Sequence, residues 1–299
     1  MKLSEAIELQ DAELAGIASD TTRDGYKAAI RAFVAFAGDI DASDVTPHLI
    51  RQWKVSMMKP QQRKNGACVV NRCYSQFTIA HRLKALKRLM RWLWREEVIN
   101  KEPFRRVVIP SPKPTVKGLD RPQVKAIVAA AGKRGVLPLA VVLFMIDTGC
   151  RVGGLVGATL RDVDIQRREA TVIEKGEKQR TVFFTSLTAE VLQAYLLTRP
   201  NVGSDAFFIS QHGKPYSTRG VYFMVKSLGD KVGVKVSPHQ FRHTAARAWL
   251  ENGLDVGTVS QLLGHSTPII TIQHYGSWST KKLKHFHNEA TMVSEGIAL

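Results

Sequence analysis

The stretch 237–275 brings together residue types that could act jointly on a phosphate ester. His239 and Arg242 are spaced i, i+3, so they share one face if a helix begins just before them. His265 lies further along the chain, and Tyr275 follows that histidine ten residues later. An arginine fork suits phosphate oxygens, a histidine can move protons, and a tyrosine hydroxyl becomes a nucleophile when its proton is removed.

Two predicted helices and a turn must position these side chains. Ser237-Pro238 indicates a helix start, because serine caps helices well and proline is tolerated in the first turn. The segment 244–250 is small and apolar, and Asn252-Gly253 ends it. A second helix is predicted over 256–263, directly before the later histidine. The chain then turns at Pro268 and continues to the tyrosine.

Two motifs upstream complete a set that resembles a known family. Thr148-Gly149-Cys150-Arg151 supplies a second arginine, and the basic stretch 174–180 is typical of a hairpin turn that carries a lysine. In this order, the motifs resemble the signature of the tyrosine recombinases, and the compact chain resembles their Cre- or Xer-like type. The resemblance implies six catalytic residues, namely Arg151, Lys175, His239, Arg242, His265 and Tyr275.

The resemblance also implies a mechanism. Tyr275 would attack the scissile phosphate, form a 3′-phosphotyrosyl link and release a 5′-hydroxyl. Arg151 and Arg242 would neutralise the non-bridging oxygens, while Lys175 would protonate the leaving oxygen and the two histidines would handle protons. Because the covalent link stores the bond energy, no cofactor, ATP or metal ion is expected. The sequence accordingly shows neither a Walker-type loop nor a carboxylate cluster suited to two metals.

Each of these residues taken alone also has a structural explanation. Arg151 and Arg242 could each pair with a structural carboxylate, and Lys175 could be an ordinary turn lysine. His265 could be a helix-terminal histidine favoured by the helix dipole. The ordered set favours the catalytic interpretation over these alternatives. His243 has no role in the resemblance and is predicted to be structural.

The chain departs from the family pattern at two places. The family commonly has a small residue and an acid shortly after Arg151, where this chain has Gly153-Gly154, so a supporting carboxylate is expected to be missing. The family tyrosine usually falls nine residues after the histidine, at the position of His274, one residue before Tyr275. We expect the extra residue in the loop around Pro268, since inside a helix it would rotate the hydroxyl by about 100°.

The charge of the chain indicates a polyanionic partner. Its 43 Lys and Arg residues against 26 Asp and Glu residues give a net charge of +17. Such a balance favours phosphate-backbone binding, and the resemblance specifies double-stranded DNA with inverted-repeat core sites. Three cysteines without metal-ligand spacing suit a reducing cytoplasm. No apolar run approaches about 18 residues and no signal peptide is recognisable, so we expect a cytoplasmic protein without a membrane segment.

Residues 1–107 are predicted to form an all-helical domain that binds the core site of the DNA. Its longest helix, 75–98, carries an apolar stripe and an opposite basic face, which could be merely solvated but is predicted to face DNA. The polar segment 59–66 is predicted to be a loop, and the proline-rich segment 108–119 a linker. The predicted DNA-binding residues, including two beyond the linker, are Arg82, Lys84, Lys87, Arg88, Arg91, Lys178 and Arg180.

Residues 120–299 are predicted to form the catalytic domain. Short strands are expected over 163–165, 170–173 and 181–184, between helices on both sides. The fold class is therefore mainly α, with a small antiparallel β-sheet in the second domain. The tail after Tyr275 is expected to add an amphipathic helix. The resemblance implies that this tail joins neighbouring subunits in a tetramer on DNA, and the alternative is that it folds back on its own domain.

Three functions remain open at this point. The first is a site-specific DNA recombinase that serves integration, excision or resolution in a bacterial, phage or mobile-element setting. The second is an enzyme that only nicks and reseals DNA, as type IB topoisomerases do. The third is a catalytically silent DNA-binding relative, which the displaced tyrosine brings into consideration.

Overall fold

The computed structural model describes residues 1–65, 68–112, 118–174 and 178–275, with backbone only at 61–65, 68–72 and 274. Contacts divide the chain into two compact units, Met1–Lys113 and Pro114–Leu299. This division falls inside the segment 108–119, for which a linker was predicted. Among the described residues, no helix is long and apolar enough to span a membrane.

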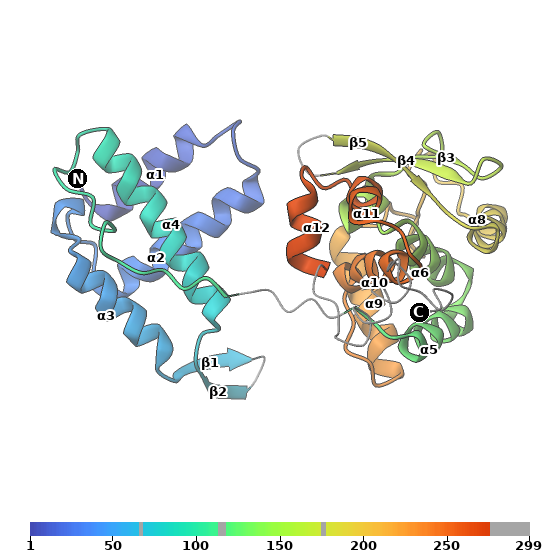
Figure 1. Ribbon diagram of the computed structural model, residues 1–299, viewed down its shortest axis with the longest axis horizontal. Helices are drawn as coiled ribbons and strands as arrows, with labels where there is room; N and C mark the ends of the chain where they lie inside the picture. The colour runs from blue at the N-terminus through green and yellow to red at the C-terminus, as the bar shows by residue number, and fades with distance from the viewer. Residues whose placement is uncertain (66–67, 113–117, 175–177, 276–299) are drawn as a thin grey trace, which may run out of the picture. The chain divides into compact units, whose positions relative to one another are not determined.

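The first unit is built from four helices around one apolar core (Figure 1). Thr46 and Ser75 cap the third and fourth helices, because their hydroxyl oxygens accept from the backbone N–H groups of Leu49 and Thr78. The core includes the edge-to-face pair Phe33 and Trp53. The helices are α1 (Leu3–Glu13), α2 (Asp20–Ala37), α3 (Pro47–Met58) and α4 (Gln76–Arg95), with a 3₁₀ turn at Ala42–Asp44.

The first unit also contains a β-hairpin, so the prediction of an all-helical domain with a loop at 59–66 was wrong. Strands β1 (Gln61–Asn65) and β2 (Cys68–Arg72) pair antiparallel, with Gln61 opposite Arg72 and Asn65 opposite Cys68. The strand β1 lacks the apolar alternation that indicates a half-buried strand, and the hairpin was missed for that reason. The dipeptide Asn65-Gly66 was the available signal in the sequence, since Asn-Gly marks turns.

The second unit packs its helices around α6 (Val136–Thr148). This helix is apolar on all sides, as a helix inside a core must be, and it contacts α5, α7, α8, α10 and β5. An aromatic cluster that includes Phe144, Tyr195 and Phe208 fills the space beside it. The remaining helices are α5 (Arg121–Arg134), α7 (Val152–Gly157), α8 (Ser186–Thr198), α9 (Thr218–Lys231), α10 (Pro238–Glu251), α11 (Val256–Leu263) and α12 (Pro268–Tyr275).

A three-stranded antiparallel sheet completes the second unit and agrees with the predicted fold class. Its order is β3 (Val163–Asp164), β4 (Glu169–Glu174) and β5 (Lys178–Phe183), with Glu174 opposite Lys178 in the register. Figure 1 shows α11 and α12, in orange to red, near the end of the sheet where β4 and β5 are joined. The hairpin end of the sheet is thus near the C-terminal helices that carry the predicted catalytic residues.

Glycines end the helices that lead into this region. Gly149 after α6 has a φ of +58°, and Gly264 after α11 has a φ of +65°, both in the left-handed region that other residues rarely adopt. Arg151 follows the first of these turns at the N-cap of α7. Pro268 begins α12, so the residues between Gly264 and α12 form the loop that was expected to absorb the displacement of the tyrosine.

Candidate active site

One pocket of about 440 Å³ in the second unit collects most of the predicted catalytic residues. Helix α10 contributes residues from its first turns, α12 contributes Ile270 and its last residue, strand β5 contributes its first residue, and the turns after α6 and α11 contribute the others. The lining residues are Arg151, Lys178, His239, Arg242, His243, Gly264, His265, Ser266, Ile270 and Tyr275. Five of the six predicted catalytic residues therefore meet in one place, and the sixth, Lys175, lies outside the described residues.

Arg242 is built into the floor of the pocket, with only 2% of its side chain exposed. Its guanidinium donates from Nη1 to the carbonyl oxygen of Gly149 at 2.9 Å and from Nη2 to that of Leu263 at 2.5 Å. These carbonyls lie at the C-terminal ends of α6 and α11, where helical carbonyl groups lack intrahelical partners. Burial, together with the charge of Arg151, lowers the pKa of Arg242 to about 10, so the guanidinium remains charged at neutral pH.

Arg151 is the more accessible arginine, with 37% of its side chain exposed. Its backbone N–H donates to Oε1 of Glu174 at 2.8 Å, and its Nη1 donates to Oε2 of the same carboxylate. Two arginines held in this way, one buried and one reaching into the open pocket, can offer planar forks to a phosphate whose negative charge increases in the transition state.

Glu174 was not recognised from the sequence, and it links the arginines of the pocket. It is the last residue of β4, and 3% of its side chain is exposed. Oε1 accepts from Nη2 of Arg180 at 3.1 Å and from Nη1 of Arg242 at 3.4 Å. Burial works to raise the pKa of Glu174, but the Arg151 backbone hydrogen bond and the charges of Arg180 and Arg242 outweigh it, so the pKa lies below its ordinary value.

Tyr275 makes a direct hydrogen bond that the sequence motifs did not indicate. Its hydroxyl oxygen lies 2.5 Å from Nδ1 of His243, the histidine that was predicted to be only structural. With the ring proton on Nε2, Nδ1 of His243 accepts the phenolic hydrogen. Burial raises the pKa of Tyr275 to about 12, partly offset by Arg242, so the unbound enzyme holds a protonated phenol.

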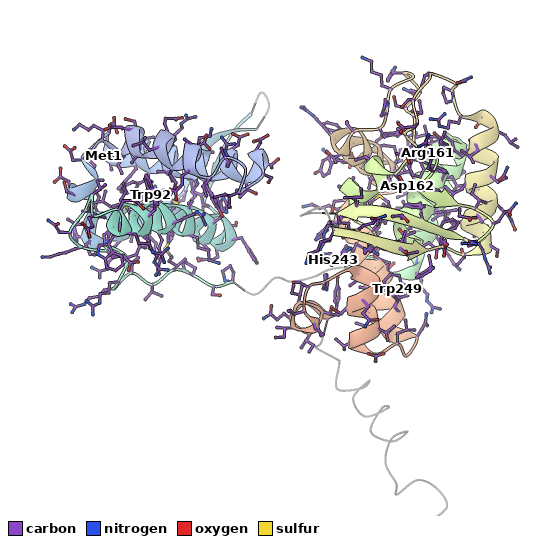
Figure 2. The ribbon with its side chains drawn as sticks, turned by 90° about the horizontal axis from the view of Figure 1, so that it is seen from above. Met1, Trp92, Arg161, Asp162, His243 and Trp249 are labelled. Atoms are coloured by element: carbon purple, nitrogen blue, oxygen red, sulfur yellow. The ribbon has the colours of Figure 1, made fainter. Side chains whose placement is uncertain are left out.

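The other two histidines are each held by a neighbour. The ring of His239 packs edge-on against that of His243, with centroids 4.5 Å apart (His243 is labelled in Figure 2). Nδ1 of His265 lies 2.7 Å from the hydroxyl oxygen of Thr271 on α12. This contact ties the turn after α11 to the helix that carries the tyrosine.

The two basic residues of β5 differ from one another. Lys178 lines the pocket that contains the predicted catalytic residues. The guanidinium of Arg180 is turned inward, with 13% of the side chain exposed, and donates to Glu174 and to the carbonyl oxygen of Leu262 at 2.5 Å. Both Nη groups that make these bonds are held inside the protein, whereas the buried Nε of Arg180 has no hydrogen-bond partner among the described residues. That Arg180 contacts DNA stays a prediction, which this inward position does not favour. Its stem also lies against Gly264, where an added Cβ would be 2.7 Å from Cδ of Arg180.

In the first unit, four of the five predicted DNA-facing residues of α4, all except Arg82, line a groove of about 400 Å³ beside α1. Lys84, Arg88 and Arg91 are exposed, while the guanidinium of Arg82 stacks over the ring of Tyr74, 4.1 Å from its centroid. Trp92, labelled in Figure 2, lines the same groove. This arrangement presents several cations on one face of the helix.

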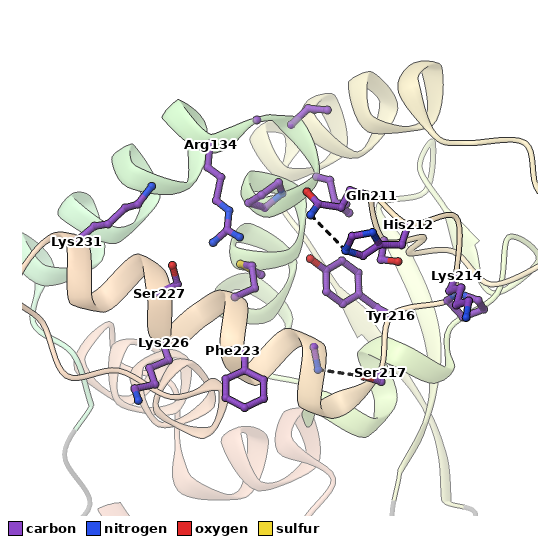
Figure 3. A pocket seen from close by; sticks show the side chains of 18 of the residues that line it. Arg134, Gln211, His212, Lys214, Tyr216, Ser217, Phe223, Lys226, Ser227 and Lys231 are labelled. Carbon is purple, nitrogen blue, oxygen red and sulfur yellow. Dashed lines mark hydrogen bonds between the residues drawn. The ribbon is translucent and has the colours of Figure 1, made fainter. Parts of the chain in front are cut away.

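The second unit also has a larger groove, of about 1260 Å³, away from these residues. It lies between α9, the end of α5 and the segment 210–217, and Figure 3 shows the basic side chains around it. Four cations line it, namely Arg134, Lys214, Lys226 and Lys231. None of the five described catalytic candidates lines this groove, and a large volume by itself does not indicate a reaction. Elsewhere in the described residues, no cluster of His, Cys, Asp and Glu side chains could hold a metal ion.

The fold and the pocket together define the class of protein. A mostly helical domain that presents two arginines, three histidines and a tyrosine in one pocket has the equipment of a DNA strand transferase with a tyrosine nucleophile. The comparisons with known proteins agree with that class. The model of the phage integrase family matches residues 117–281, which is more than half of the chain.

Relatives of known name extend the match over nearly the whole chain. The tyrosine recombinase XerC of Mycobacterium sp. (strain KMS) is 30% identical over 291 residues, covering 91% of this chain and 93% of that protein. The tyrosine recombinase XerD of Vibrio cholerae serotype O1 is 31% identical over 228 residues, covering 72% and 75%. This chain belongs to the phage integrase family and is a DNA-binding, site-specific tyrosine recombinase. The predicted nicking-closing and silent alternatives are not favoured.

Solved structures show the same fold. The Tn1549 transposon integrase in complex with transposon right end DNA has a TM-score of 0.79 at 18% identity and covers 97% of this chain and 99% of that chain. A lambda integrase tetramer bound to a Holliday junction has a TM-score of 0.70 at 17% identity and covers 90% and 78%. At this level of identity, the two matches concern the fold.

Proposed function

We propose that Tyr275 is the nucleophile with which this recombinase cleaves DNA. In the reaction, Oη attacks the scissile phosphorus, the bond to the 5′-oxygen breaks, and a 3′-phosphotyrosyl link remains. Support comes from one observation above all: the hydroxyl of Tyr275 reaches the pocket that contains both arginines, although the tyrosine is displaced by one residue from the family position. Helix α12 begins only at Pro268, so the preceding loop has room to take up the extra residue.

The other side chains of the pocket divide the remaining tasks. Arg151 and Arg242 bind the two non-bridging oxygens, and their charge stabilises the pentacoordinate transition state. His243 accepts the phenolic proton. His239, which packs against His243, and His265, which contacts Thr271, position protons around the phosphate. A lysine from the β4–β5 hairpin protonates the leaving 5′-oxygen. Lys175 fills this role by resemblance, and Lys178 is a second candidate because it lines the pocket.

The proposal is tested by trapping the covalent intermediate. A duplex selected by the full-length protein from a randomised library is prepared with a nick beside the cleavage position, so that the released end diffuses away. The wild-type protein should form a denaturant-resistant adduct, and Tyr275→Phe should not. Tyr222→Phe is the matched control, since Tyr222 is an exposed tyrosine of the same unit, on α9. Adduct formation by Tyr275→Phe would refute the assignment.

We also propose that the active form is a tetramer on inverted-repeat DNA sites. Strand exchange between two duplexes requires four cleavages, and a head-to-tail contact with closing rotation builds a ring of four subunits. The lambda integrase structure described above is a tetramer on a Holliday junction, which supports the proposal by analogy of fold. The predicted connector, residues 276–299, lies outside the described residues. Truncation after Ser279 should leave single-site binding intact and abolish cooperative occupancy of paired sites; unchanged recombination would overturn the proposal.

The biological setting follows from the relatives. Xer recombinases of bacteria are similar to this chain over most of its length, which supports a bacterial cytoplasmic protein associated with DNA. Resolution, integration and excision share this chemistry, and the DNA that flanks the gene would discriminate between them.

A further inference from the structure

Behind the pocket, the two arginines that line it contact a buried carboxylate, Glu174, that the family pattern does not account for. The sequence lacks the acid expected shortly after Arg151, because Gly153-Gly154 stands there. Glu174 reaches the same arginine from a different element, the end of strand β4. The pocket therefore has an acidic partner for its arginines, supplied by the sheet instead of the helix α7.

The contacts of Glu174 leave it little freedom. Its Oε1 accepts from the backbone N–H of Arg151, from Arg180 and from Arg242, and its Oε2 accepts from the guanidinium of Arg151. A carboxylate that accepts several hydrogen bonds from three arginines fixes their guanidinium planes relative to one another. Since the side chain is 3% exposed, removal of its charge would leave these three cations close together without a counter-ion.

Gly154 makes room for this carboxylate. A Cβ added at Gly154 would lie 3.2 Å from Cβ of Val172 and 3.6 Å from Cγ of Glu174. A larger side chain at 154 would therefore occupy the volume through which the Glu174 side chain passes. Gly154 itself is buried, so the added side chain could not turn toward solvent without moving α7. Gly154 and Glu174 are therefore complementary. The space between α7 and β4 accommodates one carboxylate, which can come from position 154 or from position 174 but not from both.

The position of Glu174 also suits the electrostatics of the reaction. Without substrate, Arg151 and Arg242 repel one another, and burial adds to the cost of the charge on Arg242. The negative charge of Glu174 offsets both the repulsion between the two arginines and the cost of burying Arg242. Arg151 contacts this carboxylate and still lines the pocket. A phosphate entering from the open side would thus meet two cations that are already oriented.

We propose that Glu174 is a positioning residue that aligns Arg151 and Arg242 on the scissile phosphate, and that it replaces the carboxylate missing at position 154. The proposal rests on the proposed function, in which these two arginines bind the phosphate. Glu174 does not touch the reacting atoms; it acts through the arginines.

The first test is Glu174→Gln, which preserves the shape of the side chain and removes its charge. The rate of covalent adduct formation on the selected, nicked duplex should fall about 100-fold, as expected when catalytic groups are displaced by about 1 Å. Affinity for the intact duplex should change less than roughly threefold, because phosphate contacts elsewhere dominate binding. Glu169→Gln is the matched control: Glu169 is on the same strand but pairs with Arg167 instead of the pocket arginines, and its replacement should leave the cleavage rate unchanged.

The second test moves the carboxylate back to the helix. Glu174→Gly vacates the space beside Gly154, and the double variant Gly154→Glu/Glu174→Gly refills it from α7. We expect the double variant to cleave at least tenfold faster than Glu174→Gly alone. Gly154→Glu alone should impair cleavage, since two carboxylates would then compete for one site. Rescue from position 154 would not occur if Glu174 served only to shape the β4–β5 turn.

The outcomes distinguish this proposal from the proposed function. Wild-type cleavage rates for Glu174→Gln, while Arg151→Ala is inactive, would overturn the positioning role and leave the assignment of the arginines standing. Normal cleavage by Arg151→Ala would overturn the proposed function itself. Equal losses of affinity and cleavage rate in Glu174→Gln, with no gain in the double variant, would show a purely structural residue and also overturn the proposal.

Discussion

The basic groove of α4 and the catalytic pocket both collect positive charge, but they hold it differently. On α4, Lys84 and Arg88 are exposed, and among the described residues Arg91 is the groove cation that forms an ion pair, with Glu102 at 3.4 Å. In the pocket, the guanidinium groups converge on one buried carboxylate and on carbonyls at helix ends.

This difference indicates two ways of using charge on the same polyanion. Exposed cations on a helix face attract the phosphate backbone and are individually replaceable, because solvent screens each of them. Buried arginines with fixed partners have one orientation and contribute to the fold as well as to the reaction. Substitutions in the groove should therefore change affinity gradually, and substitutions in the pocket should change rate or stability abruptly.

The largest expected effect separates the two arginines of the pocket. Arg242→Ala leaves the carbonyls of Gly149 and Leu263 and the carboxylate of Glu174 without this partner, so the free energy of unfolding should fall by about 3–5 kcal/mol. Arg151→Ala, at a side chain 37% exposed, should cost less than about 1 kcal/mol while abolishing cleavage. Urea denaturation monitored by circular dichroism measures both; equal stability losses would contradict the distinction.

The next effect concerns the lysines of the β4–β5 hairpin. If Lys175 protonates the leaving oxygen, Lys175→Ala should lower the cleavage rate about 100- to 10,000-fold, and a 5′-bridging phosphorothiolate should restore it, since a thiolate leaves without a proton. Lys178→Ala should then lower the cleavage rate less than Lys175→Ala, and the phosphorothiolate should raise its rate by a smaller factor. The reverse pattern would assign the proton to Lys178, which lines the described pocket.

A smaller effect is expected at His243. His243→Phe removes the acceptor of the Tyr275 hydroxyl while keeping a ring in the pocket, and should slow adduct formation about 10- to 100-fold. The loss should diminish as the pH is raised, because the pKa of Tyr275, raised to about 12 by burial, makes proton removal the difficult step. His212→Phe, at an exposed histidine outside the pocket, is the control. A pH-independent loss would assign His243 a packing role only.

The two regions also show what the sequence could predict. Local signals sufficed for the fold class: capping residues, apolar periodicity and glycine stops are properties of a few neighbouring residues, and they placed α10 and α11 well. The spacing of His239 and Arg242 along one helix also predicted that these two side chains share a face, and both line the pocket.

Contacts between residues far apart in the sequence could not be predicted from such local signals. The role of Glu174 depends on the packing of β4 beside α7, which brings its carboxylate to Arg151. The hydrogen bond between His243 and Tyr275 likewise depends on how α12 packs near α10. The inward position of Arg180 was missed for the same reason: a charged residue on a short strand is typically solvated, and the sequence did not show its contact with Glu174. The hairpin of the first unit lacked an apolar pattern but carried its Asn-Gly dipeptide.

The smallest effect is expected in the α4 groove, and it tests the other half of the comparison. Replacement of both Lys84 and Arg88 by Gln removes two exposed cations without touching the apolar stripe that packs α4 into the core. If each cation neutralises one phosphate, the slope of log K against log salt concentration should become less steep by about 1.8, roughly 0.9 per phosphate. The loss of affinity should be similar for specific and unrelated duplexes, since backbone contacts carry no sequence information. Cleavage of bound DNA should proceed at the wild-type rate under saturating protein. Arg31→Gln, at an exposed cation on α2 that pairs with Glu8, is the control and should leave the slope unchanged. An unchanged slope in the double variant would mean that the groove is a solvated face, and that DNA is held elsewhere on the protein.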